Sequence, residues 1–156
     1  MPELPEVETV VRTIRPGLVG ATIAELEILD PLVVRMPDLQ VFRDGVVGGR
    51  IASVSRRGKH IIVELESRPC LLIHLGMTGR LILGSASESP DYARLRFGLS
   101  DGSVLWYADL RKFGRLCLAA DSGQFLCKLG PEPLTGDLDE NAFRVLLAGR
   151  KRPIKS

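Results

Sequence analysis

The chain has 156 residues and a formal net charge of +2, which suits one domain or slightly more and indicates an anionic partner only weakly. Hydrophobic residues make up 45% of the chain and aromatic residues only 5%, so aliphatic side chains must fill most of the core. The three cysteines, Cys70, Cys117 and Cys127, include no C-x-x-C pair, which argues against a structural zinc site or a disulfide framework and favours a reducing cytoplasm. The acidic N-terminus does not resemble a signal peptide, and no run approaches the roughly 20 apolar residues of a membrane span.

The first predicted element is an N-terminal helix. Leu4, Val7, Val11, Ile14 and Leu18 recur at intervals of three and four residues, as they do along one face of a helix. We therefore expect a helix with this apolar stripe along one face, with Pro2 and Pro5 in its first turn and its end at Pro16 and Gly17.

The middle of the chain predicts β structure, because short apolar runs alternate with turn residues. Close spacing of about eight such runs predicts a mainly β fold with flanking helices, in the form of a two-layer β-sandwich. The strands are expected over 22–29, 51–55, 61–65, 70–75, 81–83, 95–99, 104–107 and 116–119, and two further helices over 37–47 and 139–147.

The end of the chain differs from the rest in composition. We expect residues 1–136 to form the sandwich domain, and residues 137–156 to form a helix capped by Asp139 and the start of another module. A basic run begins at Arg150, and no apolar residue follows that could bury Ile154. The remainder of that module is therefore expected to lie outside this chain.

Pro2 is the first candidate for chemistry. Methionine before a small residue is normally removed, which would leave Pro2 with a secondary amine that can form an iminium ion with a sugar aldehyde. The positive end of the helix would lower the pKa of this amine from about 8, and Glu3 beside it could transfer a proton. From these residues alone, the alternative is that Pro and Glu simply favour a helix start.

Five stretches form a set along the chain: MPELPEVETV at residues 1–10, RRGKHIIVEL at 56–65, IHLGMTGRL at 73–81, DLRKFGRL at 109–116 and LGPEPL at 129–134. In order and spacing they resemble the bacterial formamidopyrimidine-DNA glycosylases, base-excision enzymes that remove oxidised purines. The resemblance runs through essentially the whole chain and implies the N-terminal catalytic domain of such an enzyme, ending before its helix–two-turns–helix and zinc-finger modules.

The resemblance implies three catalytic residues. Pro2 is the nucleophile that forms a Schiff base at the sugar C1′, Glu3 is the proton donor and acceptor, and Lys59 reaches DNA phosphate and takes part in strand cleavage. Glu6 either helps to position Pro2 and Glu3 or is an ordinary acid of a first helical turn. Without the resemblance, Lys59 would be a solvated loop charge.

The resemblance also implies residues that hold DNA. His74 and Lys112 would contact phosphate, as would Lys151 and Lys155 in the C-terminal basic run. The alternatives are a structural role for His74 and a solvated tail for the basic run. The chain departs from the family near Tyr92. Many family members carry a His-x-His pattern at this point, whereas this chain reads Pro-Asp-Tyr-Ala.

Met77, Arg111 and Phe113 match the residues that fill the space left by an extruded nucleotide. Apolar wedges enter the base stack, and an arginine can hydrogen-bond the orphaned base. Core packing is the alternative for Met77 and Phe113, but the flanking glycines favour exposed turns.

The implied function is a bifunctional DNA glycosylase and AP lyase that acts on 8-oxoguanine and formamidopyrimidines in damaged double-stranded DNA. It would be monomeric, without contact to membranes, in the bacterial cytoplasm close to the nucleoid. No cofactor or metal is expected in this chain, because the family's single zinc ion lies in a C-terminal finger. The alternatives are a DNA-binding fragment without catalysis, and an unrelated enzyme that uses an N-terminal proline as a base.

Overall fold

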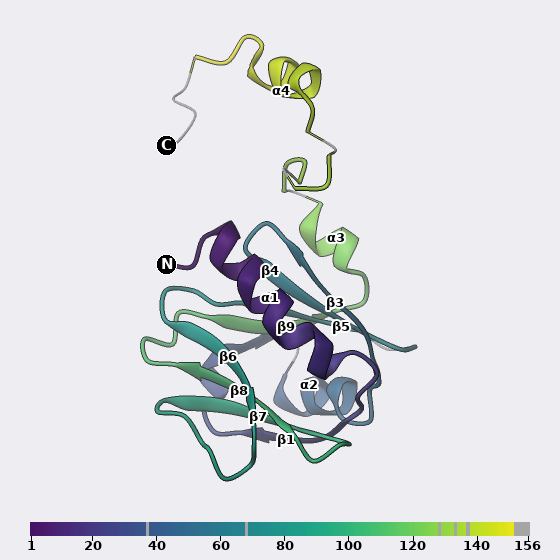
Figure 1. The fold of residues 1–156 in the computed structure, drawn as a ribbon, viewed down its shortest axis with the longest axis vertical. Helices are drawn as coiled ribbons and strands as arrows, with labels where there is room; N and C mark the ends of the chain where they lie inside the picture. Colours follow the sequence, from purple (N-terminus) through teal and green to yellow (C-terminus); the bar gives the residue numbers. More distant parts are fainter. Residues whose placement is uncertain (37, 68, 128, 133, 137, 152–156) are drawn as a thin grey trace. The chain divides into compact units, whose positions relative to one another are not determined.

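The chain is described by a computed structural model (Figure 1), which covers residues 1–36, 38–67, 69–127, 129–132, 134–136 and 138–151. Its contacts divide it into two compact units, residues 1–126 and residues 127–156, each of which is described by itself.

The larger unit is a two-layer β-sandwich, as predicted. A four-stranded sheet has the order β1 (Ile23–Ile28), β7 (Ala93–Leu99), β8 (Val104–Asp109) and β6 (Gly79–Gly84). A five-stranded sheet has the order β2 (Val34–Met36), β9 (Arg115–Ala119), β5 (Cys70–His74), β4 (His60–Leu65) and β3 (Ile51–Arg57). Neighbouring strands are antiparallel, except that β2 runs parallel to β9.

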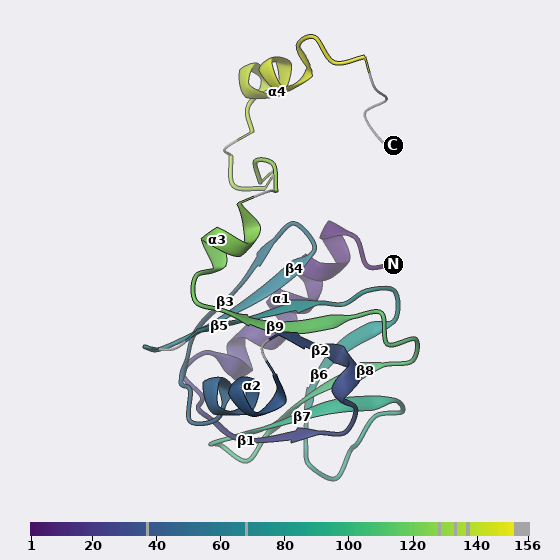
Figure 2. The ribbon, with the colours of Figure 1, turned by 180° about the vertical axis from the view of Figure 1, so that it is seen from behind.

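Two helices cover the edges of the sandwich. Helix α1 (Leu4–Leu18) packs against the edge strands β3 and β6, one from each sheet. Helix α2 (Leu39–Val46) packs against the edge strands β1 and β2 on the other side, so α1 faces the viewer in Figure 1 and α2 faces the viewer in Figure 2. Covered edges leave fewer unpaired backbone groups for pairing with another chain.

The core is aliphatic, as the composition requires. Val7, Val11, Ile14 and Leu18 of α1 are buried, which confirms the predicted apolar face of this helix. Each such side chain contributes about 1.5–3 kcal/mol when it is fully buried. The N-terminus of α1 is therefore held by packing along the whole length of the helix.

Three short elements were not predicted. They are β2, the 3₁₀ turn η1 (Pro31–Val33) and helix α3 (Ser122–Leu126), and β2 makes the number of strands in the described residues nine instead of about eight. Strand β2 has only three residues and no buried member, so it carries no alternation that a sequence pattern could reveal.

The smaller unit contains helix α4 (Glu140–Leu147), and the predicted cap is present. The Asp139 side chain accepts a hydrogen bond from the Ala142 backbone N–H at 2.7 Å. Apolar side chains of α4, including Phe143 and Leu146, remain exposed. The predicted domain division at residue 136 stays a prediction. Within the described residues, no helix combines the length and the apolar character needed to cross a membrane.

Candidate functional site

The start of α1 is held by its own first-turn acids. Glu3 is the N-cap residue, and its backbone N–H donates to the Glu6 carboxylate at 3.0 Å in a capping box. The carboxylate of Glu3 lies 2.7 Å from Lys59 Nζ in an ion pair. The structure thus brings together Glu3 and Lys59 from elements more than 50 residues apart, next to Pro2.

A second ion pair positions the turn that carries Lys59. Arg56 at the end of β3 lies 2.9 Å from the Glu8 carboxylate of α1, and its guanidinium also donates to the Gly58 carbonyl at 3.1 Å. Hydrogen bonds from Arg56 and then Arg12 lower the pKa of Glu8, against the opposing effect of burial. Glu8 and Arg56 therefore fix the β3–β4 turn against α1. Neither residue was predicted as part of the site, because their contact joins two elements that are distant in the sequence.

Pro2 opens onto a hollow of about 390 Å³, which we call the proline hollow. The hollow is lined by Pro2, Met77, Thr78, Gly79, Arg80, Tyr92 and Leu110. Met77 is 43% exposed, so it is a surface side chain and not part of the core. The candidate nucleophile and one candidate wedge therefore share one cavity, and Tyr92 forms part of its wall.

Asp109 organises the loop that carries the other two wedge candidates. It is 1% exposed and accepts hydrogen bonds from Tyr107 Oη at 3.1 Å, Gly114 N at 2.8 Å and Arg111 N at 3.2 Å. The Thr78 hydroxyl also donates to Asp109, on the same carboxylate oxygen as Arg111 N. Burial by itself would raise the pKa of Asp109, but these donors outweigh burial and lower it. Asp109 is thus a charged hub below the exposed loop.

Two glycines allow the β5–β6 turn and the 109–114 loop to touch. Gly76 has a φ of +63°, and a Cβ there would lie 2.6 Å from Gly114 N. A Cβ on Gly114 would lie 1.7 Å from Tyr107 Oη, so any side chain at that position would collide. The two loops that carry Met77 and Phe113 are consequently held side by side.

The exposed loop presents an arginine stacked on an aromatic ring. The Arg111 guanidinium carbon lies 4.7 Å from the centroid of the Phe113 ring, and Phe113 is 51% exposed. Lys112 between them adopts a φ of +57°, and its ammonium lies 2.7 Å from the Asp30 carboxylate. That hydrogen bond lowers the pKa of Asp30, against the opposing effect of burial. Lys112 is therefore an ion-pair partner within the fold, and its predicted phosphate contact stays a prediction.

His74 lies at the end of β5 beside a second imidazole. Its Nδ1 accepts a hydrogen bond from Gly76 N at 3.2 Å, and its ring centroid is 5.0 Å from that of His60 on β4. Burial lowers the pKa of both histidines. The His60 value is lowered further by His74, and the His74 value by Arg115 and Lys59. Both imidazoles are therefore mainly neutral above pH 6.5.

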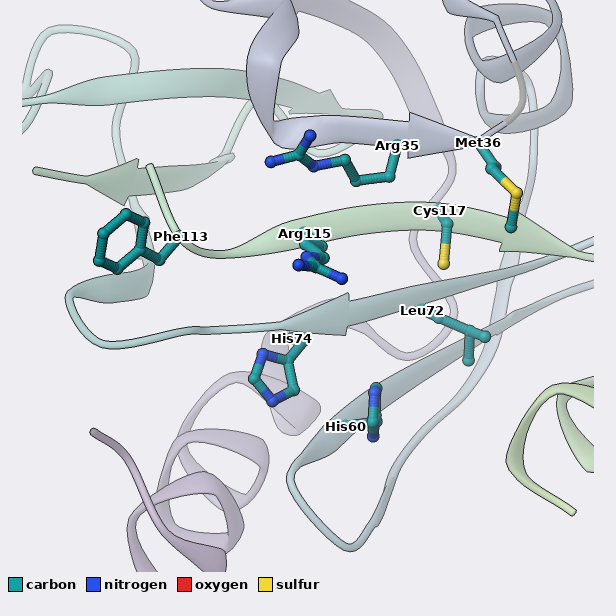
Figure 3. A pocket seen from close by; sticks show the side chains of 8 residues that line it. All are labelled: Arg35, Met36, His60, Leu72, His74, Phe113, Arg115 and Cys117. Carbon is teal, nitrogen blue, oxygen red and sulfur yellow. The ribbon is translucent and has the colours of Figure 1, made fainter. Parts of the chain in front are cut away.

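The two histidines line a larger cavity of about 670 Å³, which we call the histidine hollow (Figure 3). Its polar lining consists of Arg35, His60, His74 and Arg115, and its other members are Met36, Leu72, Phe113 and Cys117. Arg35, His60 and Arg115 were not among the predicted site residues. Only the register of the five-stranded sheet places His60 opposite His74 and His74 opposite Arg115.

The predicted basic residues near the C-terminus belong to the smaller unit. Lys151 is exposed, whereas Lys155 lies outside the described residues. Within the part of the chain that the structure describes, no three His, Cys, Asp or Glu side chains form a cluster that could hold a metal ion.

Comparisons with known proteins define the class of this sandwich as a DNA glycosylase N-terminal domain. Residues 1–116 match the family described as Formamidopyrimidine-DNA glycosylase N-terminal domain. A formamidopyrimidine-DNA glycosylase from Moorella thermoacetica is 44% identical over 99% of this chain, and one from Protochlamydia amoebophila is 38% identical over all of it. This chain belongs to the formamidopyrimidine-DNA glycosylase family.

Solved structures of the family show the same fold bound to damaged DNA. The Lactococcus lactis enzyme with DNA that contains an AP site superposes with a TM-score of 0.84 at 34% identity, covering 94% of this chain and 57% of that one. The same enzyme with DNA that contains N7-benzyl-Fapy-dG gives a TM-score of 0.83 at 36% identity, covering 94% and 55%. The chain spans 58% and 57% of the length of the Moorella and Protochlamydia relatives. These comparisons do not cover the C-terminal region in which the resemblance places the zinc finger.

Proposed function

We propose that this chain is the catalytic N-terminal part of a bifunctional DNA glycosylase and AP lyase that removes oxidised purines from DNA. The observation that carries the proposal is the proline hollow, in which Pro2 and the exposed Met77 line one cavity. Glu3 and Lys59 form an ion pair beside it. A nucleophile, a proton carrier, a cation and a wedge are the groups that reaction on an extruded nucleotide requires.

The chemistry begins with the nitrogen of Pro2. The neutral amine attacks C1′ of the extruded nucleotide, the Glu3 carboxylate accepts the proton that the amine nitrogen loses, and the C1′–N bond breaks with its electron pair leaving on the base, which takes up a proton from solvent. The sugar ring then opens at the C1′–O4′ bond, Glu3 passes its proton to O4′, and an iminium ion remains between Pro2 and C1′. The amide bond to Met1 would block this nitrogen, so the proposal requires removal of Met1.

Strand cleavage follows from the same iminium ion. Its positive charge acidifies the C2′ proton, and loss of that proton drives elimination of the 3′ phosphate with cleavage of the C3′–O bond. In the full-length enzyme, a second elimination, which begins with loss of the C4′ proton, breaks the C5′–O bond on the 5′ side. Lys59 has a flexible stem that would let its ammonium contact these phosphates, where its charge would stabilise the departing oxyanion.

Borohydride trapping tests this proposal. The purified chain, with removal of Met1 checked by intact mass, is incubated with a duplex that contains an abasic site, reduced, and mapped by peptide mass spectrometry. We expect a covalent adduct on Pro2, and we expect the adduct to persist in Arg96→Ala, because Arg96 pairs with Glu25 and lines neither hollow. An adduct on a lysine, or none at a DNA concentration that saturates binding, would refute the assignment of Pro2.

A second candidate function is DNA binding without catalysis. It is favoured by the fact that the chain spans only 58% and 57% of the length of the two relatives above. A fragment that lacks part of the phosphate contacts should bind weakly and with strong salt dependence. Salt-sensitive binding without any adduct would support this alternative.

A further inference from the structure

The histidine hollow is lined by residues of β4, β5 and β9 that lie in two rows across the sheet, and the proposed reaction assigns no role to this arrangement. His60, His74 and Arg115 stand opposite one another on β4, β5 and β9 and form a polar row across the sheet. Two residues further along the same strands, Ile62, Leu72 and Cys117 form an apolar row. Residues two apart lie on the same face of a strand, so both rows face the same side of the sheet.

Two arginine side chains add positive charge at the polar row. Arg35 of β2 and Arg115 of β9 both line the hollow, and Figure 3 shows their guanidinium groups on the same side of it as the imidazoles. Neither arginine forms an ion pair with a carboxylate among the described residues, whereas Arg56, Arg94 and Arg96 each do. Among the described residues that line the hollow, there is no Asp or Glu. The cavity therefore presents several nitrogen donors and no internal anion.

The lining residues and the volume of the hollow indicate which class of ligand it can bind. Two guanidinium groups beside imidazoles match a phosphate group, because a planar guanidinium can donate two parallel hydrogen bonds to phosphate oxygens. A cavity of about 670 Å³ exceeds what one phosphate needs. Its apolar end is lined by Leu72, Cys117 and the exposed Met36, and a sugar or base can lie against Met36 there. Phe113 at the rim is exposed and aromatic, which connects the hollow to the loop that carries the wedge candidates.

We propose that the histidine hollow binds one nucleotide unit of the DNA strand, with its phosphate on Arg35, Arg115 and the two imidazoles and its sugar or base at the apolar end of the hollow. The family resemblance implied roles only for His74 and Phe113 here, so Arg35, His60 and Arg115 are new members of the binding surface. The inference rests on the proposed function, because DNA is the phosphate-bearing ligand.

The chain contains only two histidines, and both line the hollow, so their imidazole signals report on this site. We suggest recording ¹H–¹³C NMR spectra of the purified chain while titrating the undamaged thymidine trinucleotide, with inorganic phosphate as the second probe. We expect both imidazole signals to shift and saturate with the trinucleotide and to respond more weakly to phosphate. Arg115→Ala should weaken trinucleotide binding about tenfold through loss of one charge-assisted contact, and Arg115→Lys should weaken it less.

Arg96→Ala is the matched control, because Arg96 lies on the other sheet and pairs with Glu25. It should leave the affinity unchanged, and the methyl region of each spectrum shows whether the variant is folded. The proposal is overturned if the trinucleotide shifts neither imidazole, if Arg115→Ala binds as the parent does, or if phosphate binds as tightly as the trinucleotide. Trapping at Pro2 without imidazole shifts would refute this inference alone, whereas shifts without trapping would refute only the Schiff-base chemistry.

Discussion

Replacing Asp109 with Asn tests whether one buried carboxylate holds the loop that carries Arg111 and Phe113. Each carboxylate oxygen of Asp109 accepts two hydrogen bonds: one from Tyr107 Oη and Gly114 N, the other from Arg111 N and the Thr78 hydroxyl. In Asn, one oxygen becomes an NH₂ group. The hydroxyl on that side can turn to accept from it, but the backbone N–H on that side then faces another donor.

The magnitude follows from the number of donors that lose their acceptor. A buried backbone N–H without its partner costs about 1–3 kcal/mol, and we expect a loss of that size in the free energy of unfolding. For a chain of this size, that loss lowers the melting temperature by at least about 2 °C. We also expect less adduct with abasic DNA, because the loop would lose its fixed conformation.

Urea unfolding followed by circular dichroism measures this loss, and borohydride trapping measures the effect on the loop. Asp101→Asn is the matched control, because Asp101 is an exposed turn residue whose side chain accepts hydrogen bonds from Ser103. Its unfolding free energy should change by less than about 0.5 kcal/mol. If Asp109→Asn and Asp101→Asn had the same small effect, the assignment of Asp109 as a hub would be wrong.

Two further predictions concern charges at the site. In Lys59→Gln, the loss of an exposed ion pair with Glu3 should cost at most about 1 kcal/mol in unfolding free energy, while strand cleavage at abasic DNA should fall at least tenfold; equal cleavage by both proteins would contradict the role of Lys59. For His60 and His74, burial lowers the folded-state pKa, so the unfolded chain binds more protons below about pH 6.5 and stability should fall as the pH decreases from there. Urea unfolding at pH 7.5 and 5.5 measures this difference, which should shrink in His60→Gln; an unchanged difference would show that the histidines are not its source.

Local patterns were sufficient for most elements of the fold. Helix α1 forms where it was predicted because its apolar residues recur with the helical period and pack on one face, although it continues past Pro16 and Gly17 to Leu18. The strands that were predicted have apolar runs bounded by turn residues. The unpredicted strand β2 has no such run and exists only because the β9 backbone offers a parallel partner.

The residues suggested by sequence resemblance lie at more than one place in the structure. Pro2 and Met77 line one hollow, and Glu3 contacts Lys59. His74 and Phe113 line another hollow. Their roles in DNA binding and catalysis stay predictions, because contacts with DNA depend on a partner that a sequence motif only implies.

The amino-acid order alone was enough to indicate the family, the first helix and the two-layer β class, since each depends on neighbouring residues or on short motifs. It could not indicate that Asp109 is a hub, that Glu8 holds Arg56, or that Arg115 lies opposite His74. Side-chain alternation tells which face of a strand a residue occupies, but not which strand lies beside it or in what register. Those neighbours are decided only when distant segments pack, and they create both the fixed loop and the histidine hollow.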